Sequence, residues 1–191
     1  MKISKLNNNI TPSGTMAISN KARILKEQGK PVIGFGAGEP DFPTPSHVIE
    51  EVKIASENPK YHKYTAVGGL PILREEISRT TKEYSNFEID PDNVVVTNGG
   101  KQAILTTFMS LLDPGDEVLI PSPYWTTYPE AVKISGGQPV IVNTDFENDF
   151  KVTVEQLEEK FTEKTKVLVW VSPSNPTGVV YSKEEAEEIY N

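Results

Sequence analysis

The residues best suited to chemistry lie where predicted strands end. Three β-branched residues, Val94-Val95-Val96, predict a short buried strand that turns on Gly99-Gly100 into a helix beginning at Lys101. A helix N-terminus offers free N–H groups and the positive end of its dipole, so this joint is suited to an anion such as phosphate. A tight strand–helix joint without any ligand explains the same residues about as well.

Two further segments follow predicted strands in the same way. Trp125 comes after the strand expected over Glu117–Ile120, and Asn175 comes after the apolar run Val167–Val171. In open α/β sheets, ligands bind at the carboxyl edge of the parallel strands. An indole there could stack on a planar ring, and an amide could donate a hydrogen bond to a ring substituent. A core aromatic and a turn-forming asparagine are the plainer interpretations, but the agreement of three loops favours a binding site.

The elements that must position these residues alternate between strands and helices, which predicts an α/β fold with a mostly parallel sheet flanked by helices. The run Val167–Val171 should be buried on both faces, and the helix from Lys101 to Leu112 should be largely buried. Further strands are expected over Val32–Phe35 and Pro139–Val142. Further helices are expected over Met16–Gln28, over Ser46–Ser56, from Pro71, between Trp125 and Gly136, and after capping boxes at Thr153 and Ser182.

Composition narrows the classes of function. The chain of 191 residues has 19 basic and 27 acidic residues, and the net charge of −8 disfavours nucleic acid and anionic membranes as partners. The absence of cysteine excludes disulfides and thiol nucleophiles, and two isolated histidines, His47 and His62, disfavour a metal centre. The N-terminus lacks the apolar core of a signal peptide and no run reaches membrane-spanning length, so a cytoplasmic setting is expected.

Five motifs stand in the order of one enzyme family. They are Gly36-Ala37-Gly38-Glu39-Pro40-Asp41-Phe42, Lys63-Tyr64 before Gly68-Gly69-Leu70-Pro71, Gly99-Gly100-Lys101-Gln102-Ala103, Ser122-Pro123-Tyr124-Trp125 with Tyr128-Pro129-Glu130, and Pro173-Ser174-Asn175-Pro176-Thr177-Gly178. Through them, nearly the whole chain resembles the N-terminal half of a class I pyridoxal-phosphate-dependent aminotransferase of the aspartate aminotransferase branch.

The resemblance implies a fold-type I pyridoxal-phosphate transferase that acts as a homodimer with shared active sites. Residues 1–45 would form the N-terminal arm, first helix and crossover loop, which belong to the small domain. Residues 46–191 would form the first half of the cofactor-binding large domain, truncated before its second half. Substrates would be a small amino acid and a 2-oxo acid, and the reaction would transfer an amino group from aspartate, or a similar amino acid, to 2-oxoglutarate.

The resemblance also implies which residues bind the cofactor, pyridoxal 5'-phosphate. Gly99, Gly100 and Lys101 match the loop and helix N-terminus that hold its phosphate. Tyr64 matches a tyrosine that reaches the phosphate in the neighbouring subunit. Trp125 matches the aromatic residue stacked on the pyridine ring, and Asn175 matches the amide that bonds the phenolic oxygen.

A second group of matched positions meets the substrate. Gly38 matches the backbone position beside the α-carboxylate, and Asn175 and Trp125 also lie near the substrate in the family. Ser13, Thr15 and Lys101 resemble positions that meet the distal carboxylate of an acidic substrate. Thr11 stands where members that also use prephenate carry a lysine, which disfavours prephenate.

The family's Schiff-base lysine sits in a Ser-x-x-Lys segment, and no serine of this chain has a lysine three residues on. We therefore expect no catalytic residue in this chain and no activity from it alone, whether it is a fragment, a disrupted gene product or a piece of a split enzyme. A pyridoxal-phosphate β-lyase of the same fold, or a catalytically dead remnant or non-catalytic partner subunit, remain alternatives. We also expect the isolated chain to be unstable, because Val94–Thr97 and Val167–Val171 would each lose their neighbouring strands.

Overall fold

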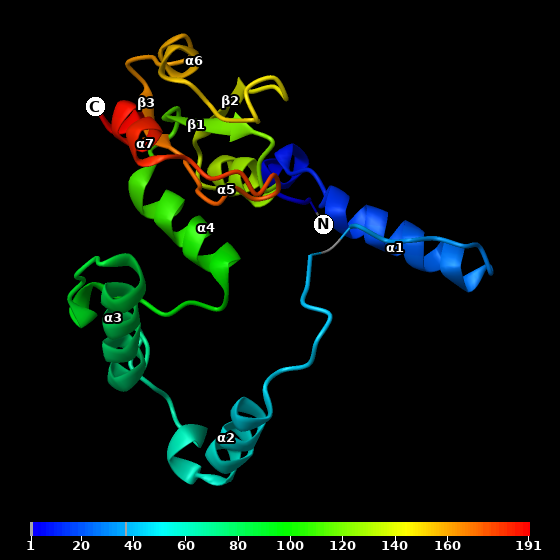
Figure 1. The fold of residues 1–191 in the computed structure, drawn as a ribbon, viewed down its shortest axis with the longest axis vertical. Coiled ribbons are helices and arrows are strands. Elements are labelled where there is room, and N and C mark those ends of the chain that lie inside the picture. Colours follow the sequence, from blue (N-terminus) through cyan, green and yellow to red (C-terminus); the bar gives the residue numbers. More distant parts are fainter. Residues whose placement is uncertain (1, 37) are drawn as a thin grey trace. The chain divides into compact units, whose positions relative to one another are not determined.

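The computed structural model describes residues 2–36 and 38–191, except for the side chain of Asn7 (Figure 1). Packing divides the chain into two units, one made of residues 1–32 and 100–191 and the other of residues 33–99. The predicted assignment of residues 1–45 to a small domain and 46–191 to a large domain stays a prediction. None of the described helices is long and apolar enough to cross a membrane.

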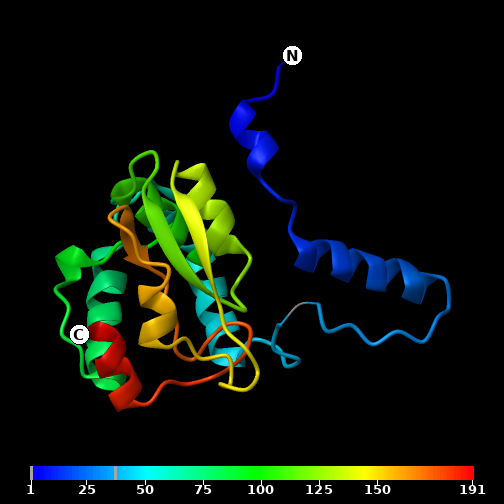
Figure 2. The same cartoon turned by 90° about the horizontal axis from the view of Figure 1, so that it is seen from above.

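The larger unit is built on a parallel sheet of three strands, seen in Figure 2. The strands are β1 (Glu117–Ser122), β2 (Gln138–Asn143) and β3 (Thr165–Leu168), in the order β2-β1-β3. Leu119 at the centre of β1 lies opposite Val140 of β2 and Leu168 of β3. The predicted parallel α/β class is therefore confirmed, and the carboxyl ends of all three strands point the same way.

Helices cover the two faces of this sheet, because successive strand side chains point to opposite sides. Val118 and Ile120 of β1 pack with residues of α4 (Gly100–Leu111) and α5 (Thr127–Ile134), whereas Leu119 packs on the other face with Val142 and Val152. Leu157 of α6 (Val154–Glu158) and Ile189 of α7 (Lys183–Tyr190) border that second cluster. Both predicted capping boxes are present at the starts of α6 and α7.

The N-terminal arm begins with a short 3-10 helix, η1 (Lys5–Asn9), and continues into α1 (Gly14–Glu27). Ser13 caps α1 by accepting a hydrogen bond from the Met16 N–H at 3.4 Å. No residue of α1 is buried. The arm is therefore held by few contacts with the body of the unit.

The unit of residues 33–99 holds α2 (Ser46–Glu57), η2 (Pro59–His62), α3 (Pro71–Ser85) and η3 (Pro91–Asn93). Arg74 joins α3 to η3: its Nε donates to the Pro91 carbonyl at 2.8 Å, and its Nη2 lies 2.9 Å from the Asp92 carboxylate. Among the described residues of this unit, only Val94 is buried. This unit therefore has little core of its own.

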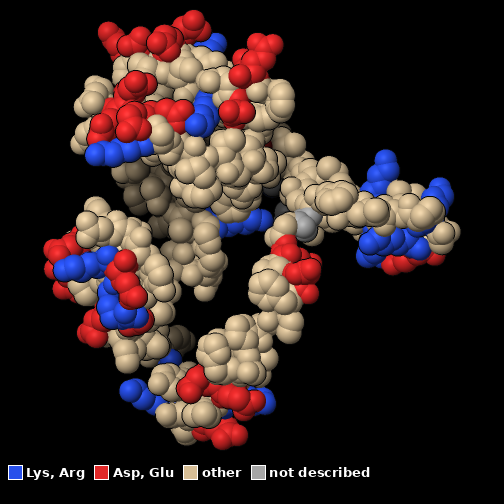
Figure 3. All heavy atoms as spheres, viewed as in Figure 1, with Lys and Arg blue, Asp and Glu red and all other residues tan. Residues whose placement is uncertain are grey.

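Acidic and basic side chains are interspersed on the face shown in Figure 3, and acidic ones gather over the part that carries α6. This distribution follows from the excess of 27 acidic over 19 basic residues. Wide areas of the same face carry neither charge.

Two predicted strands are absent. Val94–Thr97 is extended but forms no ladder, and the Val96 N–H donates instead to the Gly68 carbonyl at 2.9 Å. Val32–Phe35 is likewise irregular, with Phe35 92% exposed. Both predictions were wrong because apolar, β-branched runs form strands only where a neighbouring strand supplies hydrogen bonds, and neither run finds one within its part of the described chain.

The expectation that Val167–Val171 loses its neighbours is also wrong. Its first residues belong to β3 and pair with β1, and the Val169 N–H donates to the Leu119 carbonyl at 2.9 Å. The run is half-buried rather than buried on both faces. Strand pairing depends on topology, and the local apolar pattern carried no information on which strand would lie beside this one.

The helix α4 is less buried than its apolar pattern predicts. Of its residues only Phe108 is buried, and Met109 is 64% exposed. The helix packs against α5 and β1 along one side, so apolar residues on its other sides find no cover in this unit.

Candidate cofactor and substrate site

Four of the predicted site residues line one open groove of about 880 Å³ in the larger unit. Ser13 and Thr15 come from the N-terminal arm, Lys101 from the first turn of α4, and Trp125 from the segment between β1 and α5. Ser13 and Trp125 are 112 positions apart in the sequence. The fold thus brings together three segments that the sequence could only match separately.

Lys101 lies at the N-terminal end of α4, where the first turn contains no acidic residue. Within the part of the chain that the structure describes, its ammonium group forms no ion pair. The helix dipole adds positive potential at the same end. This end of the groove is therefore suited to an anionic group.

Gly99, immediately before α4, has a φ of +81°, which favours glycine because a side chain is strained in that conformation. Its N–H donates to the Thr97 carbonyl at 2.8 Å, closing the turn, and the Thr97 hydroxyl donates back to the Gly99 carbonyl at 3.1 Å. Among the described residues, no atom lies within 4 Å of a Cβ added at Gly99 or Gly100. Neither glycine has a side chain of its own that would keep a ligand group from the backbone.

Trp125 is half-buried, and its ring meets that of Tyr128 edge-on, with ring centres 5.5 Å apart and an angle of 89°. Tyr128 belongs to the first turn of α5 and is buried in the core. This burial raises the pKa of its hydroxyl. An edge-to-face pair of this kind fixes the orientation of both rings. The indole is thus a rigid part of the groove wall.

Asn175 lies outside this groove. It lines a separate small cavity with Tyr124, Trp170 and Tyr181, and Tyr124 also borders the groove. The turn that carries Asn175 is closed by the Ser174 N–H donating to the Val179 carbonyl at 2.9 Å and by the Gly178 N–H donating to the Ser174 carbonyl at 2.8 Å. In the same turn the hydroxyl of Thr177 is buried without a hydrogen-bond partner among the described residues.

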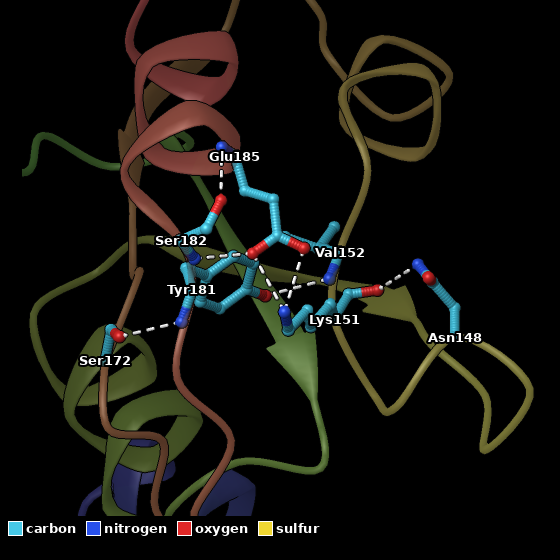
Figure 4. Close-up of polar contacts among 7 residues, drawn as sticks. All are labelled: Asn148, Lys151, Val152, Ser172, Tyr181, Ser182 and Glu185. Atoms are coloured by element: carbon cyan, nitrogen blue, oxygen red, sulfur yellow. Dashed lines mark hydrogen bonds and ion pairs between the residues drawn. The ribbon is translucent and has the colours of Figure 1, made fainter.

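Figure 4 shows polar contacts at Ser172 and Tyr181, the two ends of the loop that carries Asn175, called the Asn175 loop below. The Tyr181 N–H donates to the Ser172 hydroxyl at 3.1 Å, and the Tyr181 hydroxyl accepts from the Val152 N–H at 2.8 Å. Lys151 Nζ lies 2.8 Å from both carboxylate oxygens of Glu185. The hydrogen bond from Lys151 and a second one from the Ser182 N–H lower the pKa of Glu185.

Gly38 and Tyr64 belong to the unit of residues 33–99. Tyr64 is fully exposed, and a Cβ added at Gly38 would meet no atom within 4 Å. Their predicted roles beside the substrate and at a neighbouring subunit stay predictions. Ala37, which the first motif includes, lies outside the described residues.

The sequence predicts no role for Glu130, which accepts a hydrogen bond from the Thr11 N–H of the arm. It likewise predicts none for Lys151, Tyr181 and Glu185, which form contacts at the base of the loop between Ser172 and Tyr181. Glu130 belongs to one of the five motifs and Glu185 to a capping box, but neither pattern indicates these contacts. Lys151 and Glu185 are 34 residues apart, and no local pattern relates two residues at that separation. In the described part of the chain, no three His, Asp or Glu side chains gather as a metal site.

Comparison with known families shows to which family this chain belongs. The family described as "Aminotransferase class I and II" matches residues 30–191. The chain belongs to that family. The aspartate aminotransferase of Streptomyces avermitilis is 56% identical over 180 residues, which cover 94% of this chain and 44% of the relative. The aspartate aminotransferase of Bacillus subtilis is 50% identical over 185 residues, which cover 97% of this chain and 47% of the relative.

Solved structures of aminotransferases agree with this assignment. An aspartate aminotransferase from Thermus thermophilus, determined with maleate, superposes with a TM-score of 0.89 and 40% identity over 99% of this chain and 49% of its own. This chain therefore spans about half the length of these aminotransferase relatives.

The aminotransferase family uses pyridoxal phosphate, and the residues described above fit that molecule. An unpaired lysine at a helix N-terminus beside open glycine backbone suits its phosphate. The fixed indole of Trp125 in the groove suits its aromatic ring. Asn175 lines the neighbouring cavity and not the groove, so its predicted bond to the phenolic oxygen stays a prediction.

Proposed function

We propose that this chain supplies part of the cofactor and substrate pocket of an aspartate aminotransferase. The enzyme would transfer an amino group from aspartate, or a similar amino acid, to 2-oxoglutarate. The observation that carries this proposal is the single groove lined by Ser13, Thr15, Lys101 and Trp125. The lining of this groove combines a cation, two hydroxyls and a planar aromatic ring. These are groups that can bind an anionic cofactor and an acidic substrate.

Pyridoxal phosphate, when bound, supplies an electron sink for the exchange of the amino group. Gly99, Gly100 and Lys101 would bind its phosphate through backbone N–H groups and the ammonium group. Trp125 would orient the ring and exclude water from one side of it. Asn175 would donate a hydrogen bond to the phenolic oxygen, and Tyr64 would reach the phosphate in the other subunit of a homodimer.

Ser13, Thr15 and Lys101 would bind the distal carboxylate of the substrate, while Gly38 would lie beside its α-carboxylate. The solved Thermus thermophilus relative holds maleate, which carries two carboxylates as aspartate does, and this supports a dicarboxylic substrate. No Ser-x-x-Lys segment occurs among the 191 residues. We therefore assign this chain binding and positioning roles, and no group that moves the substrate proton.

The substitution Lys101→Ser tests the substrate class. In this chain completed by the second half of the Streptomyces avermitilis relative, it should lower kcat/KM for aspartate by about tenfold or more, because a charge-assisted contact is lost. Alanine, which has no distal carboxylate, should lose less. The measurement is the rate of glutamate formation from 2-oxoglutarate with each donor.

Lys160→Ser serves as the matched control, since Lys160 is exposed after α6 and does not line the groove. It should leave both donors unaffected. An equal loss for aspartate and alanine in Lys101→Ser would mean that Lys101 serves only the cofactor, and the dicarboxylate assignment would then be wrong.

A further inference from the structure

We propose that Glu130 is a positioning residue that holds the N-terminal arm beside the groove and thereby sets the preference for dicarboxylic substrates. Glu130 lies in the first turn of α5, and its Oε2 accepts a hydrogen bond from the backbone N–H of Thr11 at 2.9 Å. The two residues are 119 positions apart in the chain. This contact therefore ties the arm to the body of the unit.

The surroundings of Glu130 suit this task. Its other carboxylate oxygen lies 3.0 Å from Lys133 Nζ, one turn along α5, and the two side chains are 20% and 31% exposed. Burial by itself would raise the pKa of Glu130. The hydrogen bonds from the Thr11 N–H and from Lys133 together lower the pKa by more than burial raises it, so it lies below the ordinary value. The carboxylate is thus ionised at neutral pH, and hydrogen bonds to an ionised acceptor are the stronger kind.

The tie acts on the two arm residues that line the groove. Thr11 precedes Ser13 by two residues and Thr15 by four, and Ser13 caps α1. Besides this bond the arm contacts α5 through η1, whereas α1 buries none of its residues. Glu130 itself lines the groove together with Ser13, Thr15 and Lys101. Holding Thr11 therefore holds Ser13 and Thr15 at the wall of the groove that Lys101 also lines.

Both carboxylate oxygens of Glu130 already form bonds within the chain, one with the Thr11 N–H and one with Lys133, so we assign it a positioning role. The preference for dicarboxylic substrates rests on the proposed function above. The tie between Glu130 and the arm does not, because it is a property of this chain alone. The two can therefore be tested separately.

Amide hydrogen exchange of the 191-residue chain tests the tie. In Glu130→Ala the Thr11 amide should exchange about tenfold faster or more, and the first turn of α1 should exchange faster with it. Glu130→Gln keeps an oxygen acceptor and should restore part of the protection. Thr11→Ser keeps the N–H and should behave as the unmodified chain. Unchanged exchange at Thr11 in Glu130→Ala would overturn the proposal.

Kinetics of the chain completed by the second half of the Streptomyces avermitilis relative test the consequence. Glu130→Ala should raise KM for aspartate about tenfold while KM and kcat for alanine stay within about twofold, and Thr11→Pro, which removes the N–H donor, should match it. The double variant should be no worse than either single one. Equal losses for both donors would overturn the link to substrate choice. If the unmodified enzyme transfers no amino group, the proposed function fails, while the exchange measurement still decides whether Glu130 holds the arm.

Discussion

Single residues of the groove are positioned from one side by the core and left open on another. Trp125 meets the edge of the buried Tyr128, and Lys101 extends from the first turn of α4 with no ion pair among the described residues. A side chain that is fixed by the protein but not satisfied by it retains its interaction for a ligand. At the scale of single residues, this availability for a ligand is what distinguishes the candidate site.

Replacing Trp125 tests that interpretation for the cofactor. Trp125→Ala should weaken binding of pyridoxal phosphate by about 1 kcal/mol beyond the loss of buried area, or about fivefold in Kd, because ring stacking is lost. The measurement is an absorbance titration of the completed enzyme with the cofactor. Trp125→Phe keeps a ring and should recover most of the affinity, and identical Kd values for all three proteins would contradict the role.

The sequence predicted residues of this site where chemistry depends on residue type alone. The glycine pair, the lysine and the tryptophan could be predicted as candidate site residues from the sequence. Few other residue types suit a tight turn, an anion or a planar ring. The sequence did not predict the tie between Glu130 and Thr11. That bond uses a backbone N–H, which every residue except proline carries, so no pattern of side chains could have revealed it.

At the scale of elements, the Asn175 loop depends on contacts that converge on its base from α7 and from the segment before α6. Glu185 is both the capping-box partner of Ser182 and the ion-pair partner of Lys151. One carboxylate thus joins the start of α7 to Lys151. Tyr181 forms hydrogen bonds to Ser172, at the other end of the Asn175 loop, and to Val152. Asn175 is held by this frame.

This frame should be sensitive to acid. The pKa of Glu185 is lowered in the folded chain by Lys151 and by the Ser182 N–H, so its contribution to stability is present above the ordinary value of 4.5 and is lost as pH falls through the lower folded value. In urea unfolding followed by tryptophan fluorescence, the unmodified chain should therefore be more stable than Glu185→Gln at pH 7. The difference should shrink in acid below pH 4.5.

Glu184→Gln is the matched control, because Glu184 lies in the same turn of α7 and none of the ion pairs among the described residues includes it. At pH 7 it should change the free energy of unfolding less than Glu185→Gln does. A stability difference for Glu185→Gln that grows toward acid pH would contradict this account.

The connection between α5 and β2 requires a glycine at position 137. A Cβ at Gly137 would lie 2.8 Å from Leu112 Cδ1, 3.1 Å from Val132 Cγ1 and 3.2 Å from the Asp116 carbonyl oxygen. Gly137→Ala should therefore destabilise the chain by about 1–3 kcal/mol through overpacking. Gly14→Ala, whose Cβ would meet nothing within 4 Å, should leave the free energy of unfolding unchanged or slightly higher. Equal unfolding midpoints for the two variants would rule out this packing argument.

Elements were predicted well where local signals mark their ends and poorly where partners decide them. The capping boxes at Thr153 and Ser182, and Pro71 at the start of α3, are local signals, and the helices begin where they indicate. The strand expected over Val94–Thr97 and the pairing of β3 depend on which strand lies alongside, which is not a property of the segment itself.

At the scale of the whole molecule, the two units differ in how much they bury. The larger unit has a core on both faces of its sheet, whereas the unit of residues 33–99 leaves Phe35, Tyr64 and Val67 almost fully exposed. Exposed apolar side chains of this size commonly mark surfaces that bind other protein. The pairing of β3 with β1 removes one of the two grounds for expecting an unstable chain, so the stability of residues 1–191 alone stays a prediction.

The most direct test of the central claim is reconstitution of amino transfer. Purified residues 1–191 are mixed with the second half of the Streptomyces avermitilis relative, pyridoxal phosphate, aspartate and 2-oxoglutarate, and glutamate is measured over time. The account predicts glutamate formation that requires both polypeptides and that falls in Trp125→Ala. A stable complex that binds the cofactor but forms no glutamate, or glutamate formed by residues 1–191 alone, would contradict it.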